Sequence, residues 1–273
     1  MSTDEYPAGT LMAGKRGLVM GVANKNSIAW AIARQLRAQG AELAFTYLEG
    51  MEKRVRPLAE EAGVTLLTPC DVGDDASMEA AFAEIENAWG TLEFLIHAIA
   101  FSDKEELKGS FVENTTRENF KRTMDVSAYS FVDAARRAAK LMPNGGAMAT
   151  LTYLGSERVI PNYNVMGVAK AALEAATRYI ARDLGPQGIR VNAISAGPVR
   201  TLAAAGIAGG RHMFDFNQKA SPLKAPTDPA GVAGCALYLV SDLGASCTGE
   251  VVHVDGGFHI VGMPNPDDLA DDS

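Results

Sequence analysis

The sequence predicts an α/β protein: a single domain built on a doubly wound parallel sheet of about seven strands, with helices on both faces. Short apolar runs alternate with segments of helical periodicity along the chain. The runs are bounded by Gly, Pro or Asp, and no shift in composition divides the 273 residues, of which 47% are hydrophobic. We therefore expect one domain over residues 1–273, with flexible ends at residues 1–10 and 264–273.

Seven segments have the β-branched and apolar composition of strands that are buried on both faces of a sheet. In chain order they are residues 16–21, 42–47, 65–71, 92–100, 146–153, 189–195 and 251–257. A helix is expected between the first two, with Ser27 as its N-cap and Gly40 at its end. Its residues Ile28, Ile32 and Leu36 share one apolar face, so the helix can pack on the sheet.

Composition limits the partners of this chain. A formal net charge of -8 argues against general affinity for nucleic acid or for anionic membranes. The N-terminus lacks the apolar core of a signal peptide, and no stretch approaches the ~20 apolar residues of a membrane span. The three cysteines are far apart without a C-x-x-C pair, and the four histidines form no ligand cluster. We therefore expect no disulfide, no metal and a cytoplasmic location.

The junction after the first strand, GVANKNSIA at residues 21–29, is the first candidate binding site. A helix N-terminus offers unpaired N–H groups and the positive end of a dipole, and Gly21 lets a phosphate approach the backbone. The turn is not the G-x-G-x-x-G of many dinucleotide sites, because Ala23 and Asn26 stand at its second and third glycines. A tight turn with an ordinary Ser27 cap explains these residues equally well.

Two further strand ends favour a dinucleotide. Asp71 and Val72 follow the third strand, where a carboxylate and a backbone amide can bind the edge of an adenine. The fourth strand ends in HAIAFS, residues 97–102, whose small side chains leave room for a cofactor to cross the sheet. Because ligands of open α/β sheets bind at the carboxyl ends of the strands, these segments together predict a Rossmann-type cofactor site.

The segment PNYNVMGVAK, residues 161–170, sets Tyr163 and Lys170 seven positions apart at the start of a predicted helix. Seven residues are nearly two turns, so both side chains would project from one face, roughly 10 Å apart along the axis, and could share one ligand. The alternative interpretation is an amphipathic tyrosine and a solvated lysine on an ordinary surface helix.

Five segments in register make the sequence resemble one family over nearly the whole chain: residues 11–30, 41–47, 152–181, 190–204 and 249–258. The family is that of the NADH-dependent enoyl-[acyl-carrier-protein] reductases of bacterial fatty-acid synthesis, a divergent branch of the short-chain dehydrogenase/reductase superfamily. The resemblance implies reduction of the C2=C3 double bond of trans-2-enoyl thioesters on acyl carrier protein, NAD (NADH) as cofactor, and a homotetramer.

The resemblance also implies roles for individual residues. The cofactor would contact Gly21, Ser27 and Ile28 at the diphosphate, Asp71 and Val72 at the adenine, Ile99 at the adenosine ribose, and Leu48 near the adenosine end. Its nicotinamide half would contact Lys170 at the ribose and be wrapped by Val199, Arg200, Thr201, Leu202 and Ala203. The substrate would contact Ser102, Tyr153 and Tyr163, under a covering loop at residues 201–222, with a catalytic set of Tyr153, Tyr163 and Lys170.

Two positions depart from the family pattern. Leu48 stands where the family usually has Gln after F-T-Y, and Ala100 replaces the Gly of S-I-G-F. Glu49 beside Leu48 would repel the extra ribose phosphate of NADPH, so NADH is the expected cofactor. Basic residues on the following helix could instead bind that phosphate, although such residues more often form a solvated face: Lys53, Arg54 and Arg56.

The spacing of Tyr163 and Lys170 suits an enoyl thioester. Most members of the superfamily have a tyrosine four residues before the lysine, but here that position is Met166, which has no proton to donate. In a ketone the hydride goes to the carbon that bears the oxygen, whereas in an enoyl thioester it goes to C3, two carbons from the carbonyl. A more distant phenol fits that offset when both side chains face the cofactor. Tyr163 would stabilise the enolate oxygen, and the charge of Lys170 would favour tyrosinate-like character in the phenol.

Two alternative functions accompany this one. The first is a related short-chain reductase that acts on a ketone or another activated alkene, and the absence of Tyr at position 166 argues against the ketone. The second is a catalytically silent dinucleotide sensor, against which the complete pair of Tyr163 and Lys170 argues.

Two structural expectations complete the sequence analysis. Tyr153 is either a second hydrogen-bond donor at the site or a packing residue. Apolar helix faces, such as the one that carries Leu173, Ala176 and Ile180, are expected to be available for burial between the subunits of the tetramer that the resemblance implies.

Overall fold

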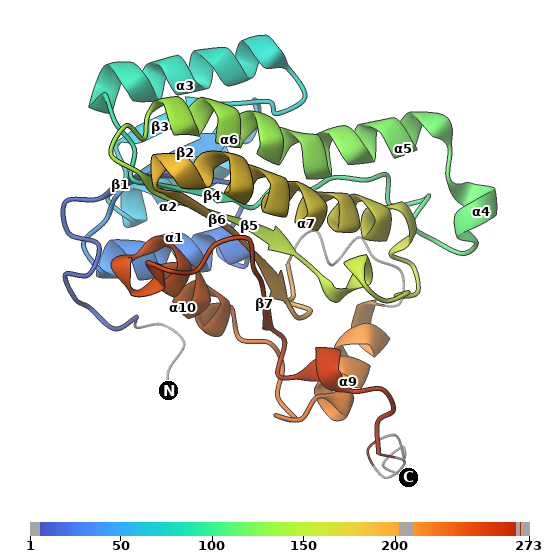
Figure 1. The fold of residues 1–273 in the computed structure, drawn as a ribbon. Helices are drawn as coiled ribbons and strands as arrows, with labels where there is room; N and C mark the ends of the chain where they lie inside the picture. Colours follow the sequence, from blue (N-terminus) through green and yellow to red (C-terminus); the bar gives the residue numbers. More distant parts are fainter. Residues whose placement is uncertain (1–5, 202–209, 266–267, 269–273) are drawn as a thin grey trace.

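A seven-stranded parallel sheet forms the centre of the computed structural model, which describes residues 6–201, 210–265 and 268 (Figure 1). The strands lie in the order β3-β2-β1-β4-β5-β6-β7, and each neighbouring pair is parallel. Their bounds are β1 Arg16–Met20, β2 Glu42–Tyr47, β3 Leu66–Pro69, β4 Phe94–His97, β5 Gly146–Thr152, β6 Ile189–Ala196 and β7 Val251–Val254. The chain winds from β1 to β3 and restarts at β4 in the opposite direction, which confirms the predicted doubly wound sheet.

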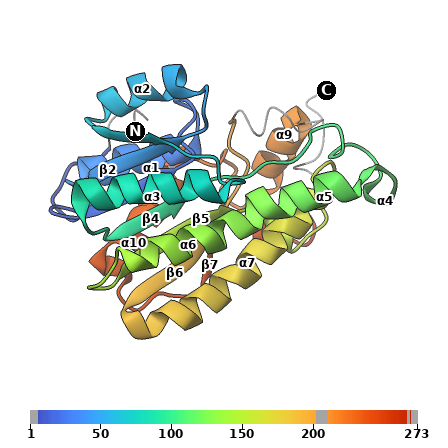
Figure 2. The same cartoon turned by 90° about the horizontal axis from the view of Figure 1, so that it is seen from above.

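Helices cover both faces of this sheet, as predicted (Figure 1, Figure 2). One layer contains α1 (Ile28–Ala38), α2 (Glu52–Glu61) and α10 (Pro229–Val240), and the other contains α3 (Asp75–Trp89), α6 (Ser130–Lys140) and α7 (Asn164–Leu184). Two buried apolar clusters correspond to the two layers. Strand residues alternate between them, because Val19 joins the first cluster whereas Leu18 and Met20 join the second.

The first strand–helix unit follows the sequence prediction. Ser27 caps α1, and its Oγ accepts a hydrogen bond from the Trp30 amide at 3.3 Å. Ile32 and Leu36 are fully buried in the cluster beneath the helix, and Ile28 packs against its edge. Gly40 follows the end of the helix with φ +91°, a conformation that a side chain would strain.

Three strands end two or three residues earlier than the sequence predicts, before the ends of the ranges 65–71, 92–100 and 251–257. After β3, Asp71 accepts a hydrogen bond from Gly73 N at 2.9 Å, and the chain turns out of the sheet. Val72 and Ile99 also lie beyond their strands, yet both pack against the core cluster. The apolar pattern therefore continues past the strands because the first residues of the loops still contribute to the core.

A long helix with an interruption runs through the second layer. The helix α5 (Arg117–Met124) continues through a π-helical turn, η1 (Asp125–Tyr129), into α6. Such turns break the regular hydrogen-bond pattern and are frequent at functional sites. The remaining elements of the described residues are α4 (Phe111–Asn114), α9 (Gly210–Ala220) and the short turns η2 (Leu154–Ser156), η3 (Gly185–Gln187), η4 (Asp242–Gly244) and η5 (Phe258–Ile260).

The face of α7 that carries Leu173, Ala176 and Ile180 packs inside the domain, so the prediction that it is available for burial between subunits is wrong. Leu173 is fully buried and Ile180 is 9% exposed within the single chain. The prediction failed because an apolar helix face indicates packing without indicating the surface that it meets. The outward side of α7 carries other exposed residues, among them Val168 and Tyr179, the latter 73% exposed.

Parts of both chain ends contact the domain, although the sequence predicts flexible ends at residues 1–10 and 264–273. Tyr6 packs against the cluster beneath α1, and the Arg34 guanidinium lies 4.9 Å from its ring centroid. Asp268 forms an ion pair with Lys224. Within the described residues, no helix combines the length and the apolar character that a membrane span requires.

Candidate active site

The carboxyl ends of β1 and β4 approach each other closely at the point where the winding of the sheet reverses. Gly21 follows β1 with φ +100°, and a Cβ there would lie 2.2 Å from the Ala98 carbonyl oxygen after β4. Any side chain at position 21 is therefore excluded by backbone, and the turn stays uncovered. Ligands of open α/β sheets bind at this reversal point.

The turn that leads into α1 is fixed by polar side chains. Ser27 Oγ donates a hydrogen bond to Asn24 O at 2.7 Å, and the Asn26 amide donates to Asn24 Oδ1 at 2.8 Å. These bonds hold the turn that the common motif builds with two further glycines. The helix then begins with the uncharged residue Ile28, so its N-terminus can receive a phosphate without like-charge repulsion from this turn.

The π-helical turn η1 and the start of α6 hold the segment that follows β4. Ser127 Oγ accepts a hydrogen bond from Phe101 N at 2.9 Å and donates one to Phe101 O at 3.0 Å. Three residues on, Ser130 Oγ lies 2.9 Å from His97 Nε2, and both groups are fully buried. The segment that contains Ile99 is thus held at both of its ends, where the sequence predicts a cofactor contact.

The predicted adenine residues lie in a tight turn after β3. The Asp71 amide donates a hydrogen bond to Ser77 Oγ at 2.9 Å, and its Oδ1 accepts from Gly73 N. The side chain of Asp71 is exposed, whereas Val72 is partly buried against the core. The turn therefore presents one carboxylate and one apolar side chain from a fixed backbone.

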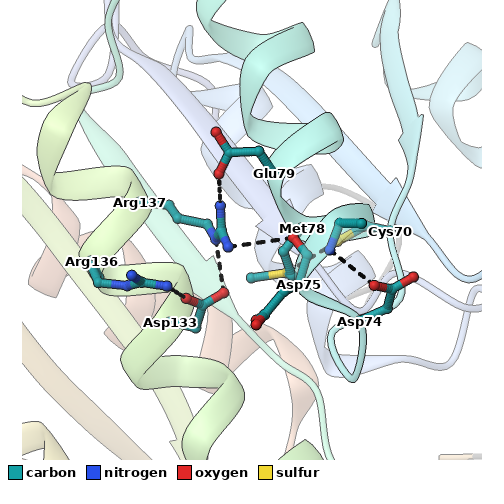
Figure 3. A network of polar contacts seen from close by, with 9 residues as sticks. Cys70, Asp74, Asp75, Met78, Glu79, Asp133, Arg136 and Arg137 are labelled. Carbon is teal, nitrogen blue, oxygen red and sulfur yellow. Dashed lines mark hydrogen bonds and ion pairs between the residues drawn. The ribbon is translucent and has the colours of Figure 1, made fainter.

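A buried ion network fastens the start of α3, just after this turn, to α6 (Figure 3). Arg137 is 9% exposed, and its Nε donates to Oδ2 of Asp133 at 2.8 Å, which is itself 2% exposed. The same guanidinium pairs with Glu79 and donates to the Asp75 carbonyl at 3.4 Å, both on α3. Burial opposes the charge of Arg137, but its hydrogen bonds to the two carboxylates raise its pKa above the usual range. This network of charge-assisted hydrogen bonds is a structural joint that links the helices α3 and α6.

The residues that depart from the family pattern are exposed. Leu48 is 53% exposed after β2, with the exposed Glu49 beside it. Ala100 is exposed after β4. Arg56, one of the basic residues that could bind a ribose phosphate, pairs with Glu52 along α2. This ion pair favours the interpretation of a solvated helix face.

Tyr153, Tyr163 and Lys170 come together at the carboxyl end of β5. The two tyrosine rings pack edge to face, with centroids 5.1 Å apart and an interplanar angle of 76°. Lys170 is 6% exposed, and its Nζ donates to the Leu151 carbonyl at 2.7 Å, two residues before Tyr153. Because α7 begins at Asn164, Tyr163 immediately precedes the helix. The interpretation as a solvated surface pair is wrong, since both side chains are buried.

The backbone on either side of Tyr163 has unusual dihedral angles. Asn162 and Asn164 have φ of +60° and +37°, values that non-glycine residues rarely adopt and that asparagine tolerates best. Both side chains bind one residue, since Asn162 Oδ1 accepts from Gly109 N at 3.2 Å and Asn164 Nδ2 donates to Gly109 O at 3.3 Å. Beneath the ring, a Cβ on Gly155 would lie 2.4 Å from Tyr163 Cδ1. Tyr163 is thus held in one location by a strained turn, as functional residues often are.

Burial determines the protonation of these three side chains. It raises the pKa of Tyr153 to about 12 and that of Tyr163 well above its ordinary value, so both phenols are neutral donors. It lowers the pKa of Lys170 to about 8, against the opposing effect of Glu174. The prediction that Lys170 gives Tyr163 tyrosinate-like character is wrong, because burial dominates. The arrangement can donate hydrogen bonds to an oxygen that gains negative charge.

Ser102 connects the loop after β4 to α5. Its Oγ bonds to Asn119 Nδ2 at 3.1 Å and to Thr123 Oγ1 at 2.9 Å. Asn119 is 6% exposed and Thr123 is fully buried. The hydroxyl of Ser102 is therefore engaged in a structural contact, and its predicted contact with substrate stays a prediction.

The predicted nicotinamide segment begins after β6. Val199 is buried and Arg200 is exposed, and the Thr201 amide donates to Val199 O at 2.8 Å. Leu202 and Ala203 lie outside the described residues, with the rest of 202–209.

The described part of the predicted covering loop, residues 201–222, contains the helix α9. The Arg200 guanidinium lies 5.6 Å from the ring centroid of Phe214 on this helix. Tyr153 Oη lies 3.7 Å from Met213 Sδ, and Phe216 packs edge to face on Phe258 of η5 at 6.0 Å. Figure 1 shows α9 beside η5, beyond the carboxyl end of β7. The helix therefore borders the tyrosines.

Sequence reasoning missed three residues of this region, Thr152, Glu174 and His97. Glu174 is 6% exposed and accepts a hydrogen bond from Thr152 Oγ1 at 2.6 Å. The available signal is its position four residues after Lys170, on a helix face that is otherwise apolar. His97 ends an apolar strand, and burial lowers its pKa to about 3, so it is neutral.

Comparison with protein families and with individual relatives gives a consistent result. A family model described as enoyl-(acyl carrier protein) reductase matches residues 21–259. Enoyl-[acyl-carrier-protein] reductase [NADH] 2 of Rhizobium meliloti is 59% identical over 255 residues, which cover 93% of this chain and 95% of the relative. The FabI enoyl-[acyl-carrier-protein] reductase [NADH] of Rickettsia bellii is 51% identical over 253 residues, 92% of this chain and 96% of the relative.

Solved structures agree with these relatives. The enoyl-(acyl-carrier-protein) reductase of Anaplasma phagocytophilum, solved in complex with NAD, has a TM-score of 0.92 and 54% identity over 96% of this chain and 100% of its own. The Bacillus cereus enoyl-acyl carrier protein reductase, solved with NADP+ and an indole naphthyridinone, has a TM-score of 0.91 and 48% identity, covering 93% of this chain and 99% of its own.

Proposed function

The chain belongs to the enoyl-(acyl carrier protein) reductase family, and from that premise we propose that it reduces the C2=C3 double bond of trans-2-enoyl-acyl-carrier-protein thioesters in fatty-acid elongation, with hydride from NADH. The observation that carries this proposal is the meeting of Tyr153, Tyr163 and Lys170 at the end of β5. The neighbouring strand β4 ends where Gly21 meets Ala98, so one extended cofactor can reach both places.

The diphosphate of NADH fits the turn between β1 and α1. Position 21 has no room for a Cβ beside the Ala98 carbonyl, so the backbone of the turn stays uncovered, and the turn leads to the N-terminus of α1 at Ile28. We assign the diphosphate to Gly21, Ser27 and Ile28, because the first amides of a helix can donate hydrogen bonds to phosphate oxygens. Ile99, on the segment after β4, is assigned to the adenosine ribose.

The adenosine fits the ends of β2 and β3. We assign the adenine to Asp71 and Val72 and its outer edge to Leu48. The exposed Glu49 beside Leu48 disfavours a ribose phosphate by like-charge repulsion, so NADH is preferred over NADPH. A kcat/KM with NADPH equal to or above that with NADH would contradict this assignment.

The nicotinamide half fits the ends of β5 and β6. We assign the nicotinamide ribose to Lys170, and the nicotinamide and phosphates to the segment of Val199, Arg200, Thr201, Leu202 and Ala203. Lys170 Nζ uses one of its three N–H donors on Leu151 O, which leaves donors for ribose hydroxyls. The charge that burial disfavours is thereby stabilised by the ligand.

The chemistry follows from the neutral phenols. NADH, when bound, supplies the hydride that adds to C3 of the enoyl thioester. Tyr163 donates a hydrogen bond to the thioester oxygen and stabilises the negative charge that develops there, because its proton stays on the phenol. Tyr153, which contacts Tyr163, is a second hydrogen-bond donor to the same substrate. Ser102 is assigned a further contact with that substrate. A proton is then taken up at C2, which completes the reduction.

The described end of the covering segment, α9, closes the site on the substrate side through Met213 and Phe214. Apolar side chains here exclude water and suit an acyl chain. The partner is acyl carrier protein, which delivers the thioester. We further propose a homotetramer in the cytoplasm, in which the exposed side of α7 around Val168 and Tyr179 contributes to contacts between subunits.

The test is a steady-state assay with the purified chain. NADH absorbance should fall when crotonyl thioester is added, and acetoacetyl thioester, a ketone of similar size, should give little turnover. Oxidation of NADH by the ketone alone would support the related ketone reductase. NADH binding without turnover of either substrate would support the dinucleotide sensor.

A further inference from the structure

We propose that Glu174 is a positioning residue that keeps Lys170 charged and holds the end of β5 in register with α7. This inference rests on the proposed function, in which Lys170 binds the nicotinamide ribose. Glu174 itself lies one helical turn beyond Lys170 and is assigned no contact with cofactor or substrate.

Three consecutive residues at the end of β5 are each contacted by one residue from α7 or its N-cap. The Leu151 carbonyl accepts a hydrogen bond from Lys170 Nζ at 2.7 Å. The Thr152 hydroxyl donates to Glu174 Oε1 at 2.6 Å. The Tyr153 ring packs against the Tyr163 ring. Glu174 therefore belongs to the same set of contacts as Lys170 on this helix and Tyr163 at its N-cap, and it anchors the residue that directly precedes Tyr153.

Glu174 and Lys170 are buried to the same degree, each 6% exposed. A buried carboxylate with a hydroxyl donor needs a nearby cation, and a buried ammonium needs a nearby anion, because burial penalises each charge alone. Glu174 raises the pKa of Lys170 and so opposes the effect of burial. The two side chains form no direct ion pair, so Glu174 compensates the charge of Lys170 through space, across one helical turn.

The other titratable groups around Lys170 do not supply this compensation. His97, from β4, is neutral because burial lowers its pKa to about 3. Tyr153 and Tyr163 are neutral because burial raises the pKa of both phenols. Asp255, after β7, acts on Tyr153 and is held by His259 and by backbone amides. Among these groups, Glu174 is the anion that acts on Lys170.

The experiment measures NADH affinity by fluorescence titration from pH 6.5 to 9.5, without turnover. Wild-type affinity should decrease above about pH 8, where Lys170 loses its proton. Glu174→Gln keeps the shape of the side chain but removes its charge, so the decrease should begin about one pH unit lower or more. Glu174→Asp, which keeps the charge, should restore much of the wild-type midpoint.

Thr152→Val is the matched control. It removes the hydrogen bond to Glu174 and keeps the carboxylate, so the midpoint should stay at the wild-type pH even if the affinity itself changes. An unshifted midpoint in Glu174→Gln, or an equal shift in Thr152→Val, would overturn the proposal. Absence of NADH binding and of crotonyl thioester reduction in the wild type would overturn the proposed function instead.

A variant that does not fold is also informative. If Glu174→Gln is unfolded at pH 7, the double variant Glu174→Gln with Lys170→Met should fold, because the uncompensated buried charge is gone. An unfolded double variant, alongside a folded Lys170→Met single variant, would contradict the compensation of Lys170 by Glu174.

Discussion

Arg137 and Lys170 are both buried cations in the helix layer that α6 and α7 share, yet their surroundings differ in kind. Arg137 contacts two carboxylates and a carbonyl, and the two carboxylates raise its pKa despite burial. Lys170 donates to one carbonyl within the described residues, and burial lowers its pKa to about 8. The fold satisfies the first charge, whereas in the proposed function the bound cofactor adds the hydrogen bonds that satisfy the second.

The difference distinguishes a structural joint from a binding site. In the joint, each charge compensates another, so the ions serve to hold the two helices together. At Lys170 the fold positions the charge without compensating it fully. Such incomplete compensation is typical of functional sites, where groups are held ready for a ligand or a transition state. The following predictions test this division, from the largest expected effect to the smallest.

The largest effect is expected when the joint loses its central anion. Asp133→Ala should lower the free energy of unfolding by about 3–5 kcal/mol, because it leaves the buried Arg137 charge without its buried carboxylate partner. Denaturant unfolding measures this loss. The matched control is Glu79→Gln, whose carboxylate is 74% exposed and whose removal should cost under about 1 kcal/mol. If the two variants lost similar amounts of unfolding free energy, burial would not make the Asp133–Arg137 pair more stabilising than the Glu79–Arg137 pair.

The next largest effect is expected on catalysis, at the site that contains Lys170 and Tyr163. Tyr163→Phe should lower kcat by about 10²–10³-fold with little change in NADH affinity, because the lost hydrogen bond forms mainly in the transition state. A smaller loss is expected if Tyr153 takes over as donor, and Tyr153→Phe in the same background separates the two contributions. Normal turnover in the variant without both hydroxyls would refute the role of the phenols.

A smaller effect is expected on cofactor binding. Lys170→Ala should weaken NADH binding by about 1.5–3 kcal/mol, the range for hydrogen bonds to a charged group. Because burial lowers the pKa of Lys170 in the folded protein to about 8, the wild-type affinity for NADH should be highest below that pH and should decrease as the pH rises through it. The variant should show no such decrease. Fluorescence titration at several pH values checks both points, and an unaltered affinity would remove Lys170 from the cofactor site.

The smallest effect is expected at Ala100. Ala100→Gly should leave enoyl reduction within a few-fold and tighten the binding of inhibitors that stack on the nicotinamide, since one ill-fitting methyl group is typically worth ~1–3 kcal/mol. Inhibitor titration of both forms measures the change. Equal inhibitor affinity would show that the exposed methyl group of Ala100 points away from the ligand.

Apolar patterning predicted the sheet well, because parallel strands buried on both faces leave a strong signal. It predicted the strand ends less well, since residues such as Val72 and Ile99 leave the sheet and remain packed against the core. The same ambiguity explains the error at Leu173 and Ile180, whose apolar face packs against the interior of the domain.

The polar residues were harder to predict than the apolar ones. Spacing singled out Tyr163 and Lys170 as a candidate pair, and the resemblance to the reductase family implied their roles, which stay predictions. Glu174 was missed because a charged residue on a helix is usually solvated, and only packing shows that it is buried. The same holds for Asp133 and Arg137. Their i,i+4 spacing is also that of an exposed ion pair on a helix surface, and only packing shows that they are buried. The sign of the pKa shift at Tyr163 depends on burial, which spacing does not report.

The measurement that tests the central claim most directly is a turnover of crotonyl thioester with NADH that carries deuterium at the transferred position of C4. The claim is that Tyr163 and Lys170 are spaced for a substrate whose oxygen is offset from its reacting carbon. The account predicts butyryl thioester with deuterium at C3 and a solvent proton at C2. Deuterium at C1, in an aldehyde or alcohol product, would contradict it, because the hydride would then have gone to the carbon that bears the oxygen.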